Sequence, residues 1–484
     1  FHVPGAGKTA AAIAAAQQLP GGYVIVVTRA SVKRFWKREI DSMTDAGALI
    51  VDGVASRSIS GSHRFIILSW EILPAHMETL IGMPIGIAIF DEVHRGKNFK
   101  AEYDDGVAGD PDQPAPIGQG AMQRTRARSW NWRAASAAIS RHAECVIALT
   151  GTPITDRVRD LYAQLDLLNP DGFGTFKQFA LRYCGGEVAN IAGREVFKTT
   201  GYSNLDELAD RWGTYCHVVT ADRAYAALPP IRRVIHFIPP GDLIADKFLH
   251  SRAEASAFGA LIASNRDDAG SYFESKLQAA CSRKRRHVVD LVVEIAGGGG
   301  KVVVLTGRKK DCDDLEKALR RHPEAGERIA IWKTYGKEGG EGHTAADREG
   351  IADAYMKAPG MAVLIATRDT MGESINLQDS DALIQAMLPW TPGQIIQSEG
   401  RVHRLGQTRP AVIHYLIAEG TVDDHVADLL INKLPPFATL TGDKAVGDLK
   451  DQIAGLQDQD ALIDQLYAAT VTASDRDAGL EASI

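Results

Sequence analysis

The chain has 484 residues, of which 45% are hydrophobic and 24% charged, with a formal net charge of −7. This length suggests roughly three domains of about 150 residues each, with apolar residues enough for large cores. No apolar run reaches the roughly 18 residues of a membrane span, and the scattered cysteines argue against zinc, against a disulfide framework and for a soluble protein of a reducing cytosol.

Short apolar runs rich in β-branched residues predict buried parallel strands, and the stretches between them carry helical spacing, as at Thr9–Gln18 and Ser31–Met43. Such alternation predicts an α/β domain built on a parallel sheet. Residues 101–128 are rich in Gly, Pro and Asp and predict a loop inserted in this domain. The expected strands are Tyr23–Thr28, Phe65–Ser69, Ile85–Phe90 and Cys145–Thr150.

The strand pattern returns in the second half of the chain, so we expect two α/β lobes. Residues 1–160 form the first lobe, 161–290 a mostly helical region, 291–435 the second lobe, and 436–484 a tail without an assigned role. Gly297–Gly300 predicts a hinge or loop. The expected helices of the middle region are Leu161–Leu168, Asn204–Trp212 and Ala253–Ile262, and the expected strands of the second lobe are Lys301–Thr306, Ala330–Thr334, Met361–Ala366, Ala382–Met387 and Ala411–Ile417.

Pro4–Thr9 has the composition of a phosphate-binding loop that opens a helix. Its glycines allow backbone N–H groups to approach phosphate oxygens, and a helix N-terminus attracts negative charge. Lys8 would contact the β- and γ-phosphates, and the Thr9 hydroxyl would bind Mg²⁺. The complete pattern has a glycine where His2 stands, and an ordinary glycine turn gives the same short sequence.

Asp91 and Glu92 follow the expected strand Ile85–Phe90, and parallel sheets bind ligands at the carboxyl ends of their strands. Asp91 would hold Mg²⁺ through water, and Glu92 would position or activate the attacking water. An exposed turn is the alternative, which the phosphate loop upstream disfavours. Thr150–Pro153, taken alone a turn, would in this context sense the γ-phosphate.

Arg401 and Arg404 lie three residues apart near the other end of the chain, so they share one face of a helix. Arginine is always charged and binds phosphate oxygens with a planar fork. A solvated basic helix would have the same sequence. With the phosphate loop, the pair predicts arginine fingers that reach the same nucleotide.

Together these motifs resemble those of the helicase-like superfamily-two ATPases, and specifically the Swi/Snf-type branch of double-stranded DNA translocases, from residue 1 to about 433. The His-Arg-Leu-Gly-Gln ending of Gln397–Gln407 is the most branch-specific signal. The segments that look like motifs I, II, III and VI are Gly5–Thr9, Asp91–His94, Thr150–Pro153 and Gln397–Gln407, and those similar to the HARP-like annealing-helicase subgroup are Phe179–Gly185, Ser203–Leu208 and Ala227–Pro230.

The resemblance implies two RecA-like lobes with ATP and Mg²⁺ between them. Its motif I begins where this chain begins, so we expect a sequence truncated at its N-terminus. In the family's motif V a second glycine stands where this chain has Ser374. The residues implied for the nucleotide are Gly5, Gly7, Lys8, Thr9, Gly372 and Gln397, and those implied for DNA phosphates are Thr28, Arg29, Ser69, Thr306, Arg308 and Thr367.

The sequence allows two roles for each of two basic clusters. Ser282–His287 is a solvated helix face or a DNA contact. Arg124, Arg126 and Arg128 stand beside Trp130 and Trp132, which suits a DNA grip or a mobile loop with packed tryptophans.

The expected function is an ATP hydrolase that moves along double-stranded or forked DNA. The alternatives are a strand-separating helicase, or a motor subunit that serves a nuclease or modification partner. We expect a cytoplasmic protein, nucleoid-associated in a prokaryotic or viral source, with no membrane partner and with a nuclease or replication or repair factor beside it.

Overall fold

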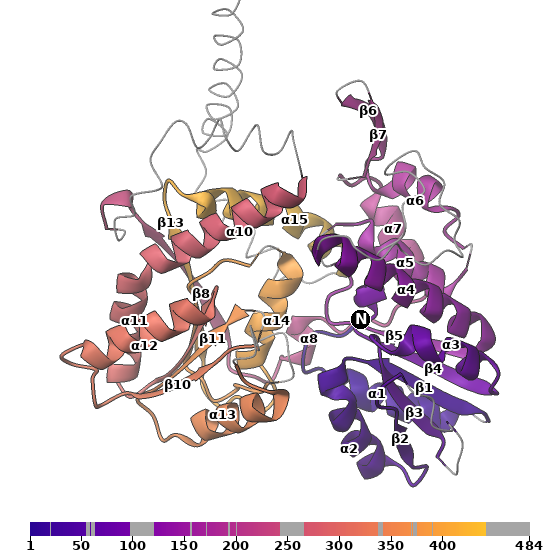
Figure 1. Ribbon diagram of the computed structural model, residues 1–484, viewed down its shortest axis with the longest axis horizontal. Helices are drawn as coiled ribbons and strands as arrows, with labels where there is room; N and C mark the ends of the chain where they lie inside the picture. Colours follow the sequence, from indigo (N-terminus) through magenta and orange to yellow (C-terminus); the bar gives the residue numbers. More distant parts are fainter. Residues whose placement is uncertain are drawn as a thin grey trace, which may run out of the picture.

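Figure 1 shows the chain, as a computed structural model, with two α/β lobes and helices above and between them. Four features expected from the sequence lie outside the described residues: residues 101–120, Ala253–Ile262, Gly372 and residues 442–484. The structure describes residues 1–19, 21–54, 59, 63–96, 121–154, 157–170, 172–191, 194–199, 201–242, 266–336, 342–368, 370, 375–389 and 391–441.

The first lobe contains a five-stranded sheet with the strand order β2-β3-β1-β4-β5, and every pairing is parallel. Helices pack on both faces, as burial of apolar side chains on both sides of the strands requires. The strands are β1 (Tyr23–Thr28), β2 (Ala48–Ile50), β3 (Phe65–Ser69), β4 (Ile85–Asp91) and β5 (Cys145–Leu149), and the helices are α1 (Lys8–Gln18), η1 (Ala30–Val32), α2 (Lys33–Met43), α3 (Leu73–Ile81), η2 (Val93–Gly96) and α4 (Ala121–His142).

The second lobe contains a six-stranded parallel sheet with the order β10-β11-β9-β12-β13-β8. Two parallel-sheet lobes, as expected, are therefore confirmed. The elements that lie C-terminal to residue 284 are α11 (Arg285–Gly297), β9 (Lys301–Thr306), α12 (Lys309–Arg321), β10 (Ala330–Thr334), α13 (Ala345–Lys357), β11 (Ala362–Thr367), β12 (Ala382–Gln385), α14 (Pro392–Val402), β13 (Ala411–Ala418) and α15 (Val422–Thr441).

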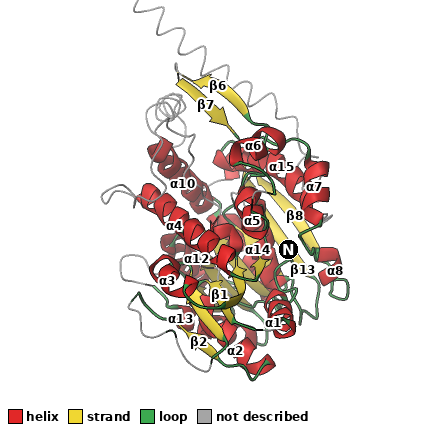
Figure 2. Cartoon of the chain, turned by 90° about the vertical axis from the view of Figure 1, so that its right-hand side faces the viewer, coloured by secondary structure: helices red, strands yellow, loops and turns green. Residues whose placement is uncertain are grey.

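The middle of the chain is not purely helical. A two-stranded antiparallel hairpin extends beyond the helices at the top of Figure 2. The strand β8 lies in the region expected to be mostly helical, yet it pairs along its whole length with β13. The elements of this region are α5 (Asp160–Leu168), α6 (Phe176–Tyr183), β6 (Glu187–Ile191), β7 (Arg194–Lys198), α7 (Leu205–Gly213), α8 (Ala221–Ala224), β8 (Ile231–Ile238), η3 (Pro240–Asp242) and α10 (Arg266–Arg283).

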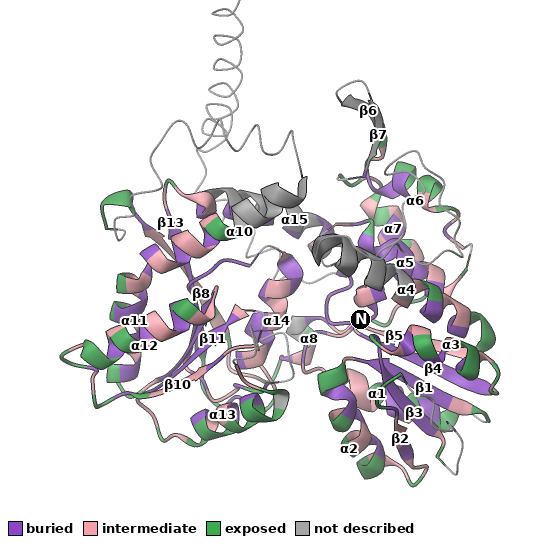
Figure 3. Cartoon of the chain, viewed as in Figure 1, coloured by how far each residue is buried: buried purple, intermediate pink, exposed green. Residues whose placement is uncertain are grey.

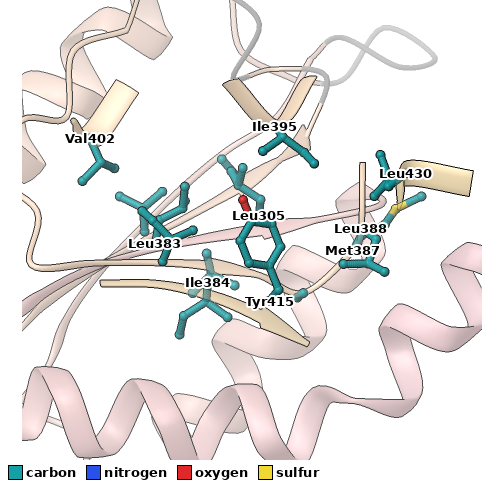
Figure 4. Close-up of a cluster of buried hydrophobic side chains, with 14 of the residues drawn as sticks. Leu305, Leu383, Ile384, Met387, Leu388, Ile395, Val402, Tyr415 and Leu430 are labelled. Carbon is teal, nitrogen blue, oxygen red and sulfur yellow. The ribbon is translucent and has the colours of Figure 1, made fainter. Parts of the chain in front are cut away.

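The second lobe has a continuous apolar core beneath α14 and α15. Figure 4 shows Ile395 and Val402 of α14 and Leu430 of α15 around Leu305 of β9 and Ile384 of β12. All five side chains are almost fully buried. The strands β4 and β9 are buried along their whole length, whereas β5, β8 and β10 are mostly half-buried. The exposed residues gather on the outer helices (Figure 3). This packing fixes α14, and with it the arginines near its end, on the sheet.

Parts of two segments that were expected to be loop or tail are helical. Residues 121–128, expected as part of an inserted loop, belong to α4, and residues 436–441, expected as tail, belong to α15. Over the part of the chain that the structure describes, no helix combines the length and the apolar character needed to cross a membrane.

Candidate functional site

The loop before α1 has the backbone of a phosphate cradle. Gly5 and Gly7 have φ angles of +83° and +77°, which favour glycine, and Gly7 directly precedes the helix. The Lys8 ammonium donates to the His2 carbonyl at 3.0 Å. A Cβ atom on Gly151 would lie 3.1 Å from Lys8 Nζ, so the lysine lies against the turn after β5. Burial lowers the pKa of Lys8, and the carboxylates Glu92 and Asp91 oppose this shift.

Asp91 is held in one orientation at the end of β4. Its Oδ2 atom accepts hydrogen bonds from the Thr28 hydroxyl at 2.8 Å and from the Trp36 indole at 2.9 Å. The Trp70 indole donates to the Asp91 carbonyl at 2.9 Å. Burial raises the pKa of Asp91, with a further contribution from the Glu92 charge, and the two hydrogen bonds to its carboxylate oppose that rise. These partners fix the orientation of the carboxylate.

Glu92 has an unusual backbone and an unsatisfied oxygen. Its φ angle of +51° lies in the left-handed region, which a side chain other than glycine rarely adopts. Its Oε2 atom is buried without a hydrogen bond and lies 3.4 Å from His94 Nδ1. A left-handed backbone at a residue other than glycine and a buried oxygen without a hydrogen bond are concentrated at functional sites, which makes Glu92 a candidate for one.

The loop before α1 and the segment after α14 meet at this site. A Cβ atom on Gly5 would lie 3.0 Å from Arg404 Cγ, which puts that side chain directly on the loop. The pKa of Arg401 is lowered to about 10, mainly by burial and also by the Arg404 charge, while the Glu92 charge opposes the shift. Both arginines also lower the pKa of Lys8. The structure therefore brings five expected catalytic residues together: Lys8, Asp91, Glu92, Arg401 and Arg404.

A chain of hydrogen bonds crosses from one lobe to the other. Gln397 of α14 donates to the Thr152 hydroxyl at 3.2 Å. The Thr152 amide donates to the Thr150 hydroxyl at 3.0 Å, and His94 Nδ1 lies 3.1 Å from that hydroxyl. His94, which follows the carboxylates Asp91 and Glu92, is thus connected to the helix that carries Arg401.

Glu399 anchors α14 through partners that the sequence did not indicate. Both oxygens of its carboxylate accept from the Arg233 guanidinium, at 2.8 and 2.7 Å, and the Tyr415 hydroxyl donates to Oε1 at 2.6 Å. The Glu399 and Arg233 side chains are only 7% and 12% exposed. The only available signal was the position of Glu399 between Gln397 and Arg401.

The oxygen atoms at the site suit a magnesium nucleotide. Mg²⁺ prefers carboxylate and hydroxyl oxygens, completed by phosphate oxygens and water. The Asp91 carboxylate, the bare Glu92 oxygen and the Thr9 hydroxyl at the start of α1 are donors of this kind. The glycine cradle and the N-terminus of α1 match the phosphates.

Most of the hydroxyls expected to contact DNA are inside the fold. Thr28 is fully buried and donates to Asp91, so we reassign it to the carboxylate site. The Ser69 and Thr306 side chains are 3% and 2% exposed, and the Thr367 hydroxyl is bonded to that of Thr370. Burial separates these hydroxyls from solvent, so they are not accessible to a duplex in this conformation.

The two expected arginines, by contrast, are partly exposed. Arg29 is close enough to lower the pKa values of Arg95 and Arg348, after the larger effect of burial on each. Arg308 contacts Ser282 and Asp311 at the start of α12.

The cluster Ser282–His287 is divided between buried and exposed side chains, since Lys284 lies inside the fold and Arg286 is exposed. Lys284 is completely buried and donates to Asp423 at 2.6 Å and to the Leu416 carbonyl at 2.7 Å. Arg285 pairs with Asp314 at 3.3 Å. The cluster therefore ties α11 to α12 and α15. In the other basic cluster only Trp132 is described at the side-chain level, and Arg95 lies over its ring.

The chain is similar to several known proteins. Residues 283–406 match the helicase conserved C-terminal domain. A SWI/SNF-related matrix-associated actin-dependent regulator of chromatin subfamily A-like protein 1 from Xenopus laevis is 26% identical over 442 residues, 89% of this chain and 41% of that protein. The DNA annealing helicase and endonuclease ZRANB3 of Bos taurus is 28% identical over 320 residues, 63% of this chain and 28% of that protein.

The chain thus spans less than half the length of these relatives. Among solved structures, the Sulfolobus solfataricus SWI2/SNF2 ATPase core in complex with dsDNA is 19% identical, with a TM-score of 0.37 over 95% of this chain and 91% of that one. In its motifs, its two parallel-sheet lobes and its relatives, the chain is similar to the Swi/Snf-type branch of the superfamily-two helicase-like ATPases.

Proposed function

We propose that this chain hydrolyses ATP between its two lobes and couples the reaction to movement along duplex DNA. The observation that carries the proposal is the meeting of the loop before α1 with Arg404, which places a phosphate cradle and a cation from opposite lobes in contact. The relatives named for chromatin regulation and for DNA annealing support DNA as the partner. The subgroup of annealing helicases is part of this proposal.

Each side of the site has a distinct task. The glycine loop and Lys8 bind the β- and γ-phosphates, and Thr9 and Asp91 hold Mg²⁺, which neutralises phosphate charge when bound. Glu92 orients a water molecule and accepts its proton. Gly372, outside the described residues, is a further proposed nucleotide contact.

Arg401 and Arg404 stabilise the negative charge that develops on the γ-phosphate oxygens. Their contribution is specific to the transition state, because that charge is greatest there. Both come from the second lobe, so turnover requires that the lobes be closed on the nucleotide.

The hydrogen bonds from His94 through Thr150 and Thr152 to Gln397 connect the site to α14. Loss of the γ-phosphate changes the group that Glu92 and His94 face. We propose that this change weakens the contact between Thr152 and Gln397 and lets the lobes separate. Repeated closing and opening, with Arg29 on one lobe and Arg308 on the other gripping DNA phosphates, would move the protein along the backbone.

The test is the rate of ATP hydrolysis without DNA and with single-stranded, duplex and forked DNA side by side. Duplex and forked DNA are expected to stimulate hydrolysis more than single strands do. The double variant Lys8→Ala with Glu92→Gln is the control for contaminating ATPases. A strong preference for single-stranded DNA or for RNA contradicts the duplex assignment, and hydrolysis no faster than in this double variant contradicts the enzyme assignment.

A further inference from the structure

Tyr225 stands where the segment between the lobes passes the phosphate loop. It follows α8, which lies between the two lobes in Figure 1. Just upstream, Val219 is bridged to His2, and its carbonyl accepts from the Val3 amide at 3.1 Å. The Tyr225 side chain is 7% exposed. A large polar side chain buried at this junction calls for a role.

The Tyr225 hydroxyl donates to the carbonyl of Pro4, the residue directly before Gly5. Pro4 is also where α14 meets the loop, since a Cβ atom on Gly400 would lie 2.8 Å from Pro4 Cβ. A hydrogen bond to this carbonyl therefore acts on the first residue of the cradle, at its contact with the second lobe.

The ring of the same tyrosine contacts the segment after α14. The ring centroids of Tyr225 and His403 are 4.5 Å apart, and His403 lies between Arg401 and Arg404 in the sequence. Burial lowers the pKa of Arg404, and the nearby Tyr225 oxygen opposes that shift. One side chain thus touches the loop with its hydroxyl and the arginine segment with its ring.

We propose that Tyr225 is a positioning residue that sets the distance between the phosphate loop and the two arginines. The role rests on the proposed ATPase function. An arginine finger stabilises the transition state only at the right separation, and an error of about 1 Å can reduce turnover about 100-fold. Neither lobe fixes this separation by itself, because the loop belongs to the first lobe and the arginines belong to the second. Tyr225 contacts both sides, so it can.

The hydroxyl and the ring can be tested separately. Tyr225→Phe removes the hydrogen bond to Pro4 and keeps the ring on His403, and Tyr225→Leu removes both contacts. Tyr162→Phe is a matched control, because the Tyr162 hydroxyl also donates to a backbone carbonyl, that of Gly174 at 2.9 Å, and its side chain is 8% exposed.

The readouts are DNA-stimulated kcat and KM for ATP, and the binding of ADP and of ADP with aluminium fluoride, which mimics the transition state. In Tyr225→Phe we expect kcat to fall about tenfold with KM within about twofold, since the interaction acts in the transition state. Binding of ADP with aluminium fluoride should weaken by a similar factor while binding of ADP is retained. Tyr225→Leu should lose more, and Tyr162→Phe should match the parent.

Two results overturn the inference and leave the proposed function in place. One is a kcat of Tyr225→Phe equal to that of Tyr162→Phe. The other is an equal loss of affinity for ADP and for ADP with aluminium fluoride, which would mean that Tyr225 only supports the loop. A parent that hydrolyses no ATP with any DNA overturns the proposed function, and this role with it.

Discussion

At the scale of single residues, the contact between Gly5 and Arg404 sets the first prediction. Arg404→Ala is expected to lower turnover on the order of 10³-fold, because the guanidinium stabilises charge that develops only in the transition state. ATP affinity and folding should stay close to the parent. Lys is expected to rescue poorly, since it lacks the planar fork.

The measurement is the DNA-stimulated rate with a nucleotide titration and a thermal melt as the folding control. Arg401→Ala should behave similarly. If the segment after α14 only packs on the lobe, both alanine variants will hydrolyse ATP at nearly the parent rate.

Lys8 and Glu92 should separate binding from chemistry. Lys8→Ala removes the ammonium that lies beside the Gly151 turn and should weaken nucleotide binding. Glu92→Gln keeps the shape of the side chain but cannot take a proton, so it should bind ATP and turn over about 100-fold more slowly. Nucleotide binding and hydrolysis, measured on the same preparations, check this division. Full hydrolysis by Glu92→Gln would show that another group activates the water.

Sequence alone could predict the residues of the site that belong to short local motifs, such as Lys8, Glu92 and Arg404. It could not predict Tyr225 or Arg233, because their roles depend on contacts with residues far along the chain. Nor does the type of a residue reveal where its side chain points. A threonine at a strand end, such as Thr28, could donate to a DNA phosphate or to a neighbouring carboxylate, and in the structure it is buried and donates to the carboxylate of Asp91.

At the scale of elements, the pair of Arg233 on β8 and Glu399 on α14 holds the helix before the arginines. Arg233→Met leaves the Glu399 charge buried without its partner, which is expected to cost about 3 kcal/mol or more of folding stability. Adding Glu399→Gln should restore part of that loss. Urea unfolding measures both.

The surface pairs of Arg409 with Asp379 and Asp381 supply the control, since the arginine side chain is 51% exposed. Arg409→Ala should change stability by less than about 1 kcal/mol. An equal loss from Arg233→Met and Arg409→Ala would show that the buried pair has no special role.

The histidine pair across β8 and β13 predicts a pH dependence. His236 Nε2 lies 2.8 Å from His414 Nδ1, and burial, helped by the His236 charge, lowers the pKa of His414 from 6.5 to about 4. The unfolded chain therefore binds a proton near pH 6.5 that the folded chain refuses until about pH 4, so stability falls as the pH drops through this window. His414→Gln should show a smaller fall in Tm between pH 7 and pH 5 than the parent. An equal fall in both would mean that His414 does not contribute.

Buried strands were predictable as elements, and β1 and β9 begin and end where expected, because continuous runs of β-branched residues bury well on both faces. The strand β8 was missed. It lies at the edge of its sheet and is mostly half-buried, so arginines and a histidine interrupt its apolar run. Its pairing with β13 joins segments far apart in the chain, so no local sequence pattern could predict it.

At the scale of the whole molecule, the chain has a net charge of −7, so the proposed binding of DNA requires a local concentration of cations. Arg29 of the first lobe lies close enough to lower the pKa values of Arg95 in the same lobe and of Arg348 in the second, after the larger effect of burial on each. A duplex phosphate bound there would touch both lobes, which is the arrangement that coupling to lobe closure requires.

Binding to duplex DNA should therefore be indifferent to base sequence and should weaken steeply with salt, because phosphate contacts release counterions. Arg29→Ala is expected to weaken all duplexes alike and to reduce the slope of log K against log salt by about one. Arg320→Ala, which removes an exposed cation paired with Glu316 on α12, is the control and should leave the slope unchanged. The measurement is a salt titration with two duplexes of unrelated sequence. If Arg29→Ala changes the preference between the duplexes but not the slope, Arg29 reads bases, and the phosphate grip proposed for it is wrong.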